Sequence, residues 1–450
     1  MMKLLALPAV LLALPLSAAE PAAAVRLMTL DPGHFHAALV QKFMLDGVDP
    51  VVNVYAPEGP DLTMHVQRID GFNARPENPT RWKLQVHAGP DSLRRMIAAK
   101  PGNVVVLAGN NARKTECILQ SVKAGLNVLS DKPMAIDPRS FALLREAFDE
   151  AGRRGVLLYD IMTERSEIAS LLQRELAGNA ALFGALEPGS PEQPAVTKES
   201  VHYFYKMVAG APLKRPEWFF DVTQQGEGIV DVTTHLVDLI QWACFPDQAL
   251  DWRKDPEVLT ARRWATPITP EAFERVTGAK EFPPFLRTQV DTNGALQVFA
   301  NGEFTYRLKG VHAKVVVDWR VGGEGGGKDT HFSLMRGTRA RLIIRQGEET
   351  GYKATLFIEP VGVADAAFEE ALKGAVAGLQ TKFPGVGYER AGTAWKLTVP
   401  DAYHKGHEAH FAQVTEKYIG FLKAGTLPSW EVPNMLTKYA TIMQAYEKSR

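Results

Sequence analysis

The chain of 450 residues is poor in cysteine and has no excess of charge of either sign. It contains 2 cysteines, and its 51 Lys and Arg residues balance 51 Asp and Glu residues. Two cysteines exclude a disulfide-rich scaffold, and no Cys/His group has zinc-finger spacing. Balanced charge gives no electrostatic basis for binding nucleic acid, which requires a basic face or stripe. Because 46% of the residues are hydrophobic, the sequence indicates a globular, multidomain enzyme or small-molecule binder.

Long hydrophobic runs are also missing, apart from one at the N-terminus. The basic start Met1–Lys3 precedes the apolar run Leu4–Leu16, which is followed by the small residues 17–19. This run is shorter than the ~20 residues that a membrane-spanning helix needs. Its order of basic, apolar and small residues is typical of a cleavable signal peptide. We therefore expect cleavage near Ala19, a periplasmic or secreted protein, and no membrane span.

Residues 20–165 alternate between strand-like and helix-like segments. This alternation predicts a Rossmann-type domain, in which helices cover both faces of a parallel sheet. The segment 58–83 is polar and rich in turn-forming residues, and it looks like an insertion around a short helical piece. The expected strands are 25–30, 51–55, 84–87, 103–107, 126–130 and 156–159, and the expected helices are 33–45, 113–124 and 141–152.

Residues 166–450 have a different pattern, in which short β-type segments recur with short connections. We expect an open, mostly antiparallel sheet flanked by helices, so the predicted fold class is α/β followed by α+β. The expected strands are 202–205, 258–263, 295–299, 304–308, 313–319, 341–345 and 355–358, and the expected helices lie near 228–242, 364–379, 407–424 and 435–447.

The turn after the first strand partly matches a dinucleotide-binding fingerprint. Such a site has G-x-G-x-x-G/A at this place, so that the backbone approaches a pyrophosphate. Only the middle glycine, Gly33, is present, because Asp31 and His36 occupy the other two positions. A carboxylate there opposes a pyrophosphate, and an ordinary turn is an equally good interpretation. His34 and His36 could bind a phosphate, a sugar or a metal instead.

Two later motifs are more specific. Ala124–Pro133 (AGLNVLSDKP) resembles the A-G-x-x-V-x-x-E-K-P segment of the Gfo/Idh/MocA family of oxidoreductases, with Asp131 in place of the glutamate. Gly226–Asp238 is similar to the glycine-rich entry and D-x-x-x-H-x-x-D helix of the same family. The resemblance implies NAD or NADP as cofactor, a sugar or polyol as substrate, and a C-terminal sheet that forms homo-oligomer contacts.

The resemblance also implies roles for individual residues. Lys132 would hydrogen-bond the reacting hydroxyl, and His235 would accept its proton. Asp231 precedes His235 by four residues and would orient it from the same helical face. The expected cofactor-binding residues are Asp31, Gly33, His34, Phe35, His36, Asn110, Asn111, Asp131 and Lys132.

Other polar residues are candidates for contacts with the substrate. His202 and Tyr205 belong to an expected strand, one face of which could line a sugar pocket or pack in the core. His404, His407 and His410 form H-x-x-H-E-x-H together with Glu408. Two of these imidazoles could share a metal or contact the substrate, and a polar helix start packed on the core is the other interpretation.

These features favour an exported oxidoreductase that acts on a sugar or glycoside by hydride transfer with tightly bound NAD(P). The altered turn, and export without a twin-arginine signal, leave two alternatives. One is a non-redox lyase or hydrolase of keto-sugars on the same scaffold, with or without a divalent metal. The other is a catalytically inactive sugar-binding protein.

Overall fold

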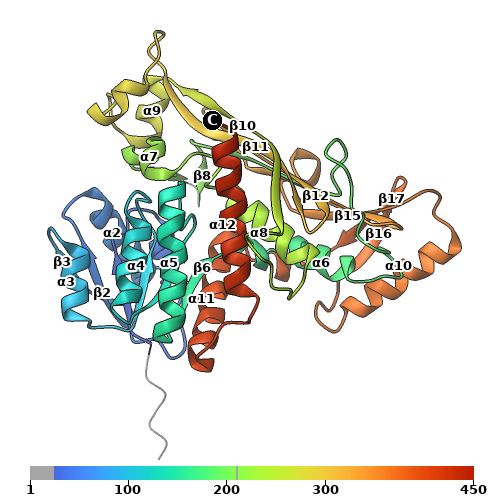
Figure 1. The fold of residues 1–450 in the computed structure, drawn as a ribbon, viewed down its shortest axis with the longest axis horizontal. Helices are drawn as coiled ribbons and strands as arrows, with labels where there is room; N and C mark the ends of the chain where they lie inside the picture. The colour runs from blue at the N-terminus through green and yellow to red at the C-terminus, as the bar shows by residue number, and fades with distance from the viewer. Residues whose placement is uncertain (1–24, 209–210) are drawn as a thin grey trace, which may run out of the picture.

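The computed structural model describes residues 25–208 and 211–450, so the expected signal peptide lies outside the described residues. Two sheets lie side by side, and the long C-terminal helix α12 (Glu431–Lys448) runs between them (Figure 1). Within the described ranges, no helix is both long and apolar enough to cross a membrane.

The first sheet is six-stranded and parallel, with the strand order β3-β2-β1-β4-β5-β6. This is the Rossmann order, and its topological switch point lies between β1 and β4. All four residues of β1, β4 and β6 are buried, as expected for strands covered on both faces. The strands are β1 (Leu27–Leu30), β2 (Val51–Ala56), β3 (Lys83–Ala88), β4 (Val104–Leu107), β5 (Asn127–Asp131) and β6 (Leu158–Ile161).

The helices around this sheet differ from the expectation at two places. The segment expected to be helical over 33–45 forms only a four-residue helix, α1 (His36–Leu39), followed by turns. The segment taken for an insertion contains a 15-residue helix, α2 (Pro60–Ala74), which begins with a proline and connects β2 to β3. The other helices are α3 (Ser92–Ala99), α4 (Lys114–Lys123) and α5 (Pro138–Arg154).

The second sheet has nine strands in the order β10-β11-β12-β7-β13-β14-β15-β17-β16. All its neighbouring strands are antiparallel except β12 and β7, which are parallel. The strands are β7 (Val196–Tyr203), β10 (Pro256–Ile268), β11 (Leu296–Leu308), β12 (Val311–Arg320), β13 (Thr330–Arg336), β14 (Ala340–Gln346), β15 (Thr355–Pro360), β16 (Gly387–Ala391) and β17 (Ala394–Thr398). The short pair β8 (Met207–Val208) and β9 (Ala211–Pro212) stands apart.

Helices α6 and α8 pack on this sheet, and α11 and α12 return toward the first sheet. The remaining helices are α6 (Ile168–Ala177), α7 (Val222–Gln225), α8 (Thr233–Cys244), α9 (Pro270–Thr277), α10 (Ala366–Leu379) and α11 (His407–Ala424). Short 3-10 helices are η1 (Thr163–Ser166), η2 (Glu217–Phe220), η3 (Pro284–Gln289), η4 (Glu348–Thr350) and η5 (Asp401–Tyr403).

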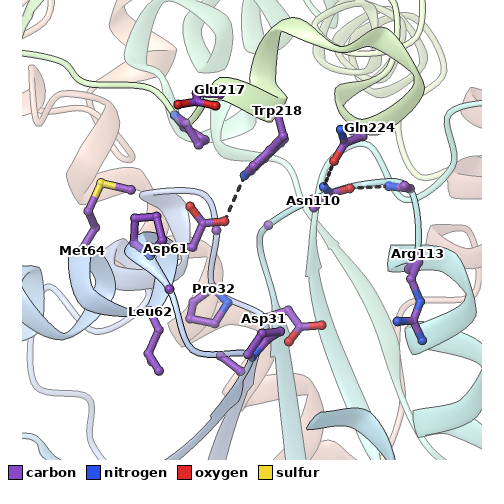
Figure 2. A pocket seen from close by; sticks show the side chains of 18 of the residues that line it. Asp31, Pro32, Asp61, Leu62, Met64, Asn110, Arg113, Glu217, Trp218 and Gln224 are labelled. Carbon is purple, nitrogen blue, oxygen red and sulfur yellow. Dashed lines mark hydrogen bonds between the residues drawn. The ribbon is translucent and has the colours of Figure 1, made fainter. Parts of the chain in front are cut away.

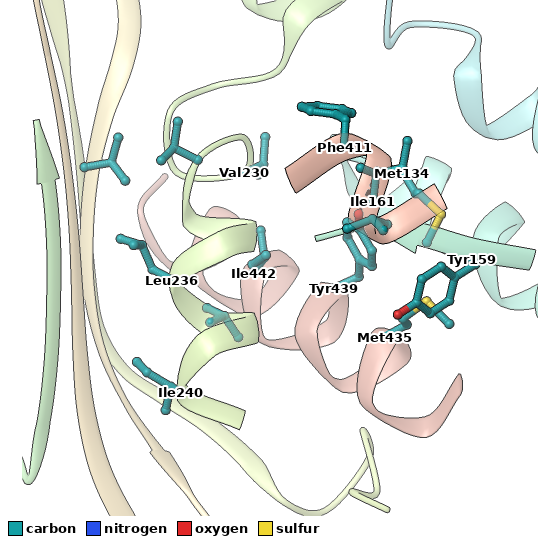
Figure 3. Packing of buried hydrophobic residues seen from close by; sticks show 14 of the residues in the cluster. Met134, Tyr159, Ile161, Val230, Leu236, Ile240, Phe411, Met435, Tyr439 and Ile442 are labelled. Carbon is teal, nitrogen blue, oxygen red and sulfur yellow. Dashed lines mark hydrogen bonds between the residues drawn. The ribbon is translucent and has the colours of Figure 1, made fainter. Parts of the chain in front are cut away.

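One continuous hydrophobic core joins the two sheets. Figure 3 shows Leu236 and Ile240 of α8 near Met435, Tyr439 and Ile442 of α12, which in turn face the end of the first sheet. The hydroxyl of Tyr439 donates to Asp160 Oδ2 at 2.9 Å and accepts the N–H of Met134 at 2.8 Å. The C-terminal helix is therefore fixed to the carboxyl ends of β5 and β6, next to the predicted catalytic lysine.

We expect Tyr439→Phe to lower the free energy of unfolding by about 1–3 kcal/mol, because a buried N–H and a buried carboxylate each lose a partner. Urea denaturation measures the effect. Tyr388→Phe is the matched control, since Tyr388 is 38% exposed, and its effect should stay within about 0.5 kcal/mol. Equal stability of Tyr439→Phe and the wild type would contradict this account of the domain junction.

Candidate functional site

A cleft of about 770 Å³ lies at the carboxyl edge of the parallel sheet, at its topological switch point. Ligands bind at this position in open α/β sheets, and the volume falls within the usual range for small-molecule sites. Figure 2 shows Asp31, Asp61, Asn110, Arg113 and Trp218 around it. The sequence did not indicate Asp61, Arg113 or Trp218 as site residues. Only the fold brings α2, the start of α4 and η2, which carry them, to one opening.

The two sides of the cleft are hydrogen-bonded to each other. The indole Nε1 of Trp218 in η2 donates to Asp61 Oδ2 at 3.0 Å, and the Asn110 amide donates to Gln224 Oε1 at 2.6 Å (Figure 2). A Cβ atom on Gly33 would lie 2.7 Å from the Asp61 carboxylate. Any side chain larger than glycine at position 33 would thus project into the cleft.

The turn after β1 has Asp31 at the position of the first glycine of the dinucleotide-binding fingerprint. It nevertheless packs closely against its neighbours. Asp31 has a positive φ of 46°, a conformation that usually requires glycine. The neighbouring Gly109 is essential to this packing, because a Cβ there would come within 2.1 Å of the Asp31 carbonyl oxygen. Asp31 Oδ1 accepts from Ser92 Oγ at 2.8 Å, and burial raises the pKa of its carboxyl. The carboxylate is thereby directed to the start of α3, and its raised pKa makes the ionised form less favourable.

The backbone amides of this turn are used inside the protein. Gly33 N–H donates to the Asp31 carbonyl at 2.8 Å, and His34 N–H donates to the Ala108 carbonyl at 3.1 Å. Cationic side chains line the cleft in their place, namely Arg113, Lys114, Lys214 and Arg215. Size and position fit a dinucleotide. Lys114 and Arg215 are buried and donate to backbone carbonyls, so the exposed Arg113 and Lys214 are the cations that its phosphates could reach.

Lys132 and Asp231 meet at the junction of the two sheets. Lys132 Nζ lies 2.5 Å from Asp231 Oδ1, and the two side chains are 11% and 7% exposed. Burial disfavours the ammonium group, but the carboxylates of Asp231 and Asp131 outweigh it and raise the pKa of Lys132. Lys132 is therefore a permanent cation, suited to donate a hydrogen bond rather than to accept a proton.

Asp231 does not orient His235 as the motif implied. Asp231 lies in the turn before α8, and its second carboxylate oxygen accepts from Gln225 Nε2 at 3.1 Å, so both oxygens are engaged elsewhere. His235 Nδ1 is buried and has no hydrogen-bond partner in the described part of the chain. Burial lowers the pKa of His235 to about 4, with Lys132 acting in the same direction and Glu164 opposing.

Three of the expected cofactor residues form a group of their own. His36 Nδ1 lies 2.9 Å and His34 Nδ1 3.9 Å from the same atom, Asp131 Oδ2. Asp131 ends β5. His34 lies in the turn after β1, the strand two positions away in the sheet, and His36 begins α1. Of the nine expected cofactor residues, Asp31, Gly33 and Asn110 line the cleft.

The others lie beside the cleft. Asn111 Nδ2 donates to the Gln225 carbonyl at 2.7 Å, which anchors the loop after β4. Phe35 packs against the rings of both His34 and His36, at centroid distances of 4.7 and 4.4 Å.

Helix α11 extends the polar group toward Glu164. His407 Nδ1 lies 3.3 Å from Glu164 Oε1, and the His407 ring is 5.5 Å from that of His36. Burial disfavours the Glu164 carboxylate, but its bond to His407 and the imidazoles of His235 and His410 hold its pKa well below the usual range. Glu164 was not expected from the sequence, although its position just after β6 is a signal that could have found it.

Of the remaining substrate candidates, His202 lies on β7 of the second sheet, whereas Tyr205 lies two residues beyond the end of this strand. His202 bridges Ser200 Oγ, 2.7 Å from its Nε2, and Asp329 Oδ2, 3.1 Å from its Nδ1. Its ring stacks on Trp319, which borders a small cavity of about 20 Å³ that Asp231 also lines. Tyr205 lies instead beneath the Arg275 guanidinium, at 4.8 Å.

Comparisons with known proteins place this geometry in a family. Residues 172–450 match the family model described as "Putative oxidoreductase C terminal domain". A crystal structure described as a "putative oxidoreductase" from Parabacteroides merdae is 52% identical, covering 95% of this chain and 98% of that chain, with a TM-score of 0.92. Among curated proteins, none matches the chain.

More distant structures share the fold. Levoglucosan dehydrogenase, in complex with NADH and levoglucosan, is 12% identical with a TM-score of 0.56, covering 94% of this chain and 97% of that chain. An Agrobacterium radiobacter oxidoreductase in complex with NAD⁺, L-tartaric acid and magnesium is 11% identical with a TM-score of 0.54, covering 95% of this chain and 96% of that chain. The chain belongs to the oxidoreductases of the Gfo/Idh/MocA type, as its two motifs indicate.

Proposed function

We propose that this protein is an exported oxidoreductase that oxidises a carbinol carbon of a sugar or glycoside with NAD(P) held in the cleft. The observation that carries the proposal is the buried Lys132–Asp231 pair, at 2.5 Å, which joins the end of β5 to the segment before α8. It places a permanent cation beside the edge of the sheet where a dinucleotide fits. Export through residues 1–19, and self-association through the nine-stranded sheet, are part of the same proposal.

The distant relatives support the cofactor and the substrate class. Levoglucosan dehydrogenase is in complex with NADH and levoglucosan, and the Agrobacterium radiobacter enzyme with NAD⁺. In this chain, Arg113 and Lys214 would contact the phosphates, and Asn110 would lie on the nicotinamide side of the cleft. NAD(P)⁺, when bound, supplies a hydride acceptor for the carbon that is oxidised.

The chain's own residues would handle the proton and the developing charge. Lys132 would donate a hydrogen bond to the substrate hydroxyl and stabilise the oxygen as it becomes anionic. His235, neutral at physiological pH, would take the hydroxyl proton on Nε2, because its Nδ1 has almost no accessible surface. The neighbouring carboxylate of Glu164 would stabilise the imidazolium that forms. Asp231 would hold Lys132 in position.

The turn after β1 favours a second candidate, a non-redox lyase of keto-sugars on the same scaffold. Its Gly33 and His34 amides donate inside the protein, and a carboxylate occupies the first glycine position. Neutral His235 could then remove a proton α to a carbonyl while Lys132 stabilises the enolate oxygen, and the oxygen substituent on the β carbon would leave with the electrons of its C–O bond. Sugar turnover by a preparation shown to be free of nucleotide would select this function over the first.

Dinucleotide binding can be tested by filling the cleft at Gly33. We expect Gly33→Leu to weaken NAD(H) or NADP(H) binding at least about tenfold, because the new side chain meets Asp61 and Trp218. Native mass spectrometry and nicotinamide fluorescence measure the bound cofactor. Gly152→Leu is the matched control, since a Cβ at that helical position has open space. Unchanged binding in Gly33→Leu, or no binding by the wild type, would remove the redox proposal.

The pH dependence tests His235 as the base. We expect kcat/KM, measured with a glycoside found by panel screening, to stay level from pH 7 to 5 and to halve near pH 4. The sign follows because the protonated imidazole cannot accept the hydroxyl proton, and burial delays that protonation to lower pH.

His235→Gln should lower kcat by about 10²–10⁴ and remove this acid limb. Circular dichroism at each pH separates the titration of the base from unfolding. An acid limb near pH 6.5, or one that persists in His235→Gln, would assign the base to another residue.

A further inference from the structure

We propose that His34, His36 and Asp131 form a binding site for a divalent transition-metal ion, for which zinc is the probe. One ring nitrogen from each histidine and one carboxylate oxygen lie within 4.8 Å of one another. The inference does not depend on the proposed redox function, because it concerns a ligand set that the cleft does not include.

The first argument is that two hydrogen-bond acceptors of the group face each other with no proton between them. His34 Nδ1 accepts the backbone N–H of His36 at 3.3 Å, so this nitrogen presents a lone pair and not a proton. It lies 3.9 Å from Asp131 Oδ2, which is also an acceptor. Two facing acceptors with no proton between them repel each other unless a cation lies nearby. A metal ion would supply that cation, in exchange for the long contact between His34 and the His36 amide.

The nearby lysines do not place an ammonium group between these two acceptors. Lys132 Nζ is directed to Asp231 Oδ1, at 2.5 Å. Lys114 Nζ donates to the carbonyl oxygens of Asp131 and Pro133, at 3.2 and 3.4 Å, rather than to the Asp131 carboxylate. The Asp131 carboxylate interacts with both lysines only through space, and its direct contacts among the described residues are with the two imidazoles.

The second argument is the burial of the ligands. Asp131 is 3% and His36 7% exposed, so water screens the group poorly. A carboxylate buried in this way is stable when it is paired with a cation or coordinates a metal ion.

The donor set indicates the class of ion. Imidazole nitrogens suit zinc, iron, copper and nickel, whereas magnesium and calcium prefer oxygen ligands alone. Two histidines and one carboxylate leave at least one coordination position for water or an oxygen of the substrate, as in catalytic zinc sites. Its ligand Asp131 directly precedes Lys132 in the chain, so the ion would lie near the Lys132 side chain. It could then contact the same hydroxyl or carbonyl oxygen of the substrate.

The test is metal binding by the full chain, without substrate or dinucleotide. After removal of metals with EDTA, we expect one Zn²⁺ per chain by elemental mass spectrometry, and competition with a chromogenic chelator gives the affinity. His36→Ala and Asp131→Asn should each weaken binding at least about 100-fold. His312→Ala is the matched control, because His312 lies on β12 and bonds only the Pro188 carbonyl among its described hydrogen-bond partners.

Two additions keep the test decisive. His34→Gln alters the partly exposed ligand and decides the outcome if His36→Ala fails to fold. Co²⁺ in place of Zn²⁺ should give visible d–d absorption in the wild type and in His312→Ala, but not in His34→Gln. Absence of stoichiometric binding by the wild type, or equal affinity in all folded variants, would overturn the metal site. NAD(P) binding is measured separately through Gly33→Leu, so failure of one proposal leaves the other intact.

Discussion

The two halves of the molecule depend on one buried guanidinium group, that of Arg165. It donates to both oxygens of Asp238 in α8, at 2.6 and 2.7 Å, and to both oxygens of Glu431 in α12, at 3.0 Å. Because η1 directly follows the last strand of the parallel sheet, this bond set fixes both helices to that sheet. Removing one partner of such a buried pair costs about 3–5 kcal/mol, since it leaves a charge without compensation.

A second cation completes the network. Lys438 of α12 has no exposed surface, and its Nζ lies 2.7 Å from Asp160 Oδ2 and 3.3 Å from Asp238 Oδ1. Salt bridges of this kind contribute little net stability but define geometry, because any other arrangement leaves a charge buried and unpaired. Their consequence for the site is the position of α8. With that helix fixed at Asp238, the preceding turn brings Asp231 to Lys132.

The site itself is divided into two regions of different chemistry. The cleft at the switch point is open and lined by side chains of both charges, as a polar cofactor requires. Beside it lies a compact group of imidazoles and carboxylates drawn from the turn after β1, the end of β5, η1, α8 and α11. Buried histidines lose their charge, so this second region offers neutral bases and metal ligands at physiological pH.

The sequence by itself determined the order of the elements, because hydrophobic periodicity and turn-forming residues are local properties of the chain. The strands of the first sheet, the Lys132 segment and the Asp231–His235 segment could all be predicted from residues adjacent in the chain. Two local predictions were wrong for physical reasons. Helix α1 ends after four residues although 33–45 is compatible with a helix, and a proline start lets the polar segment 60–74 form α2.

Only the tertiary structure decided which side chains meet. Asp231 was expected to serve His235 because they are four residues apart, but the chain enters α8 at Thr233 and directs Asp231 to Lys132, 99 positions away. Glu164 and Trp218 gained their roles in the same way. His34, His36 and Asp131 converge because parallel strands β1 and β5 end at the same edge of the sheet. Such proximity depends on sheet order and helix packing, which no local pattern of residues encodes.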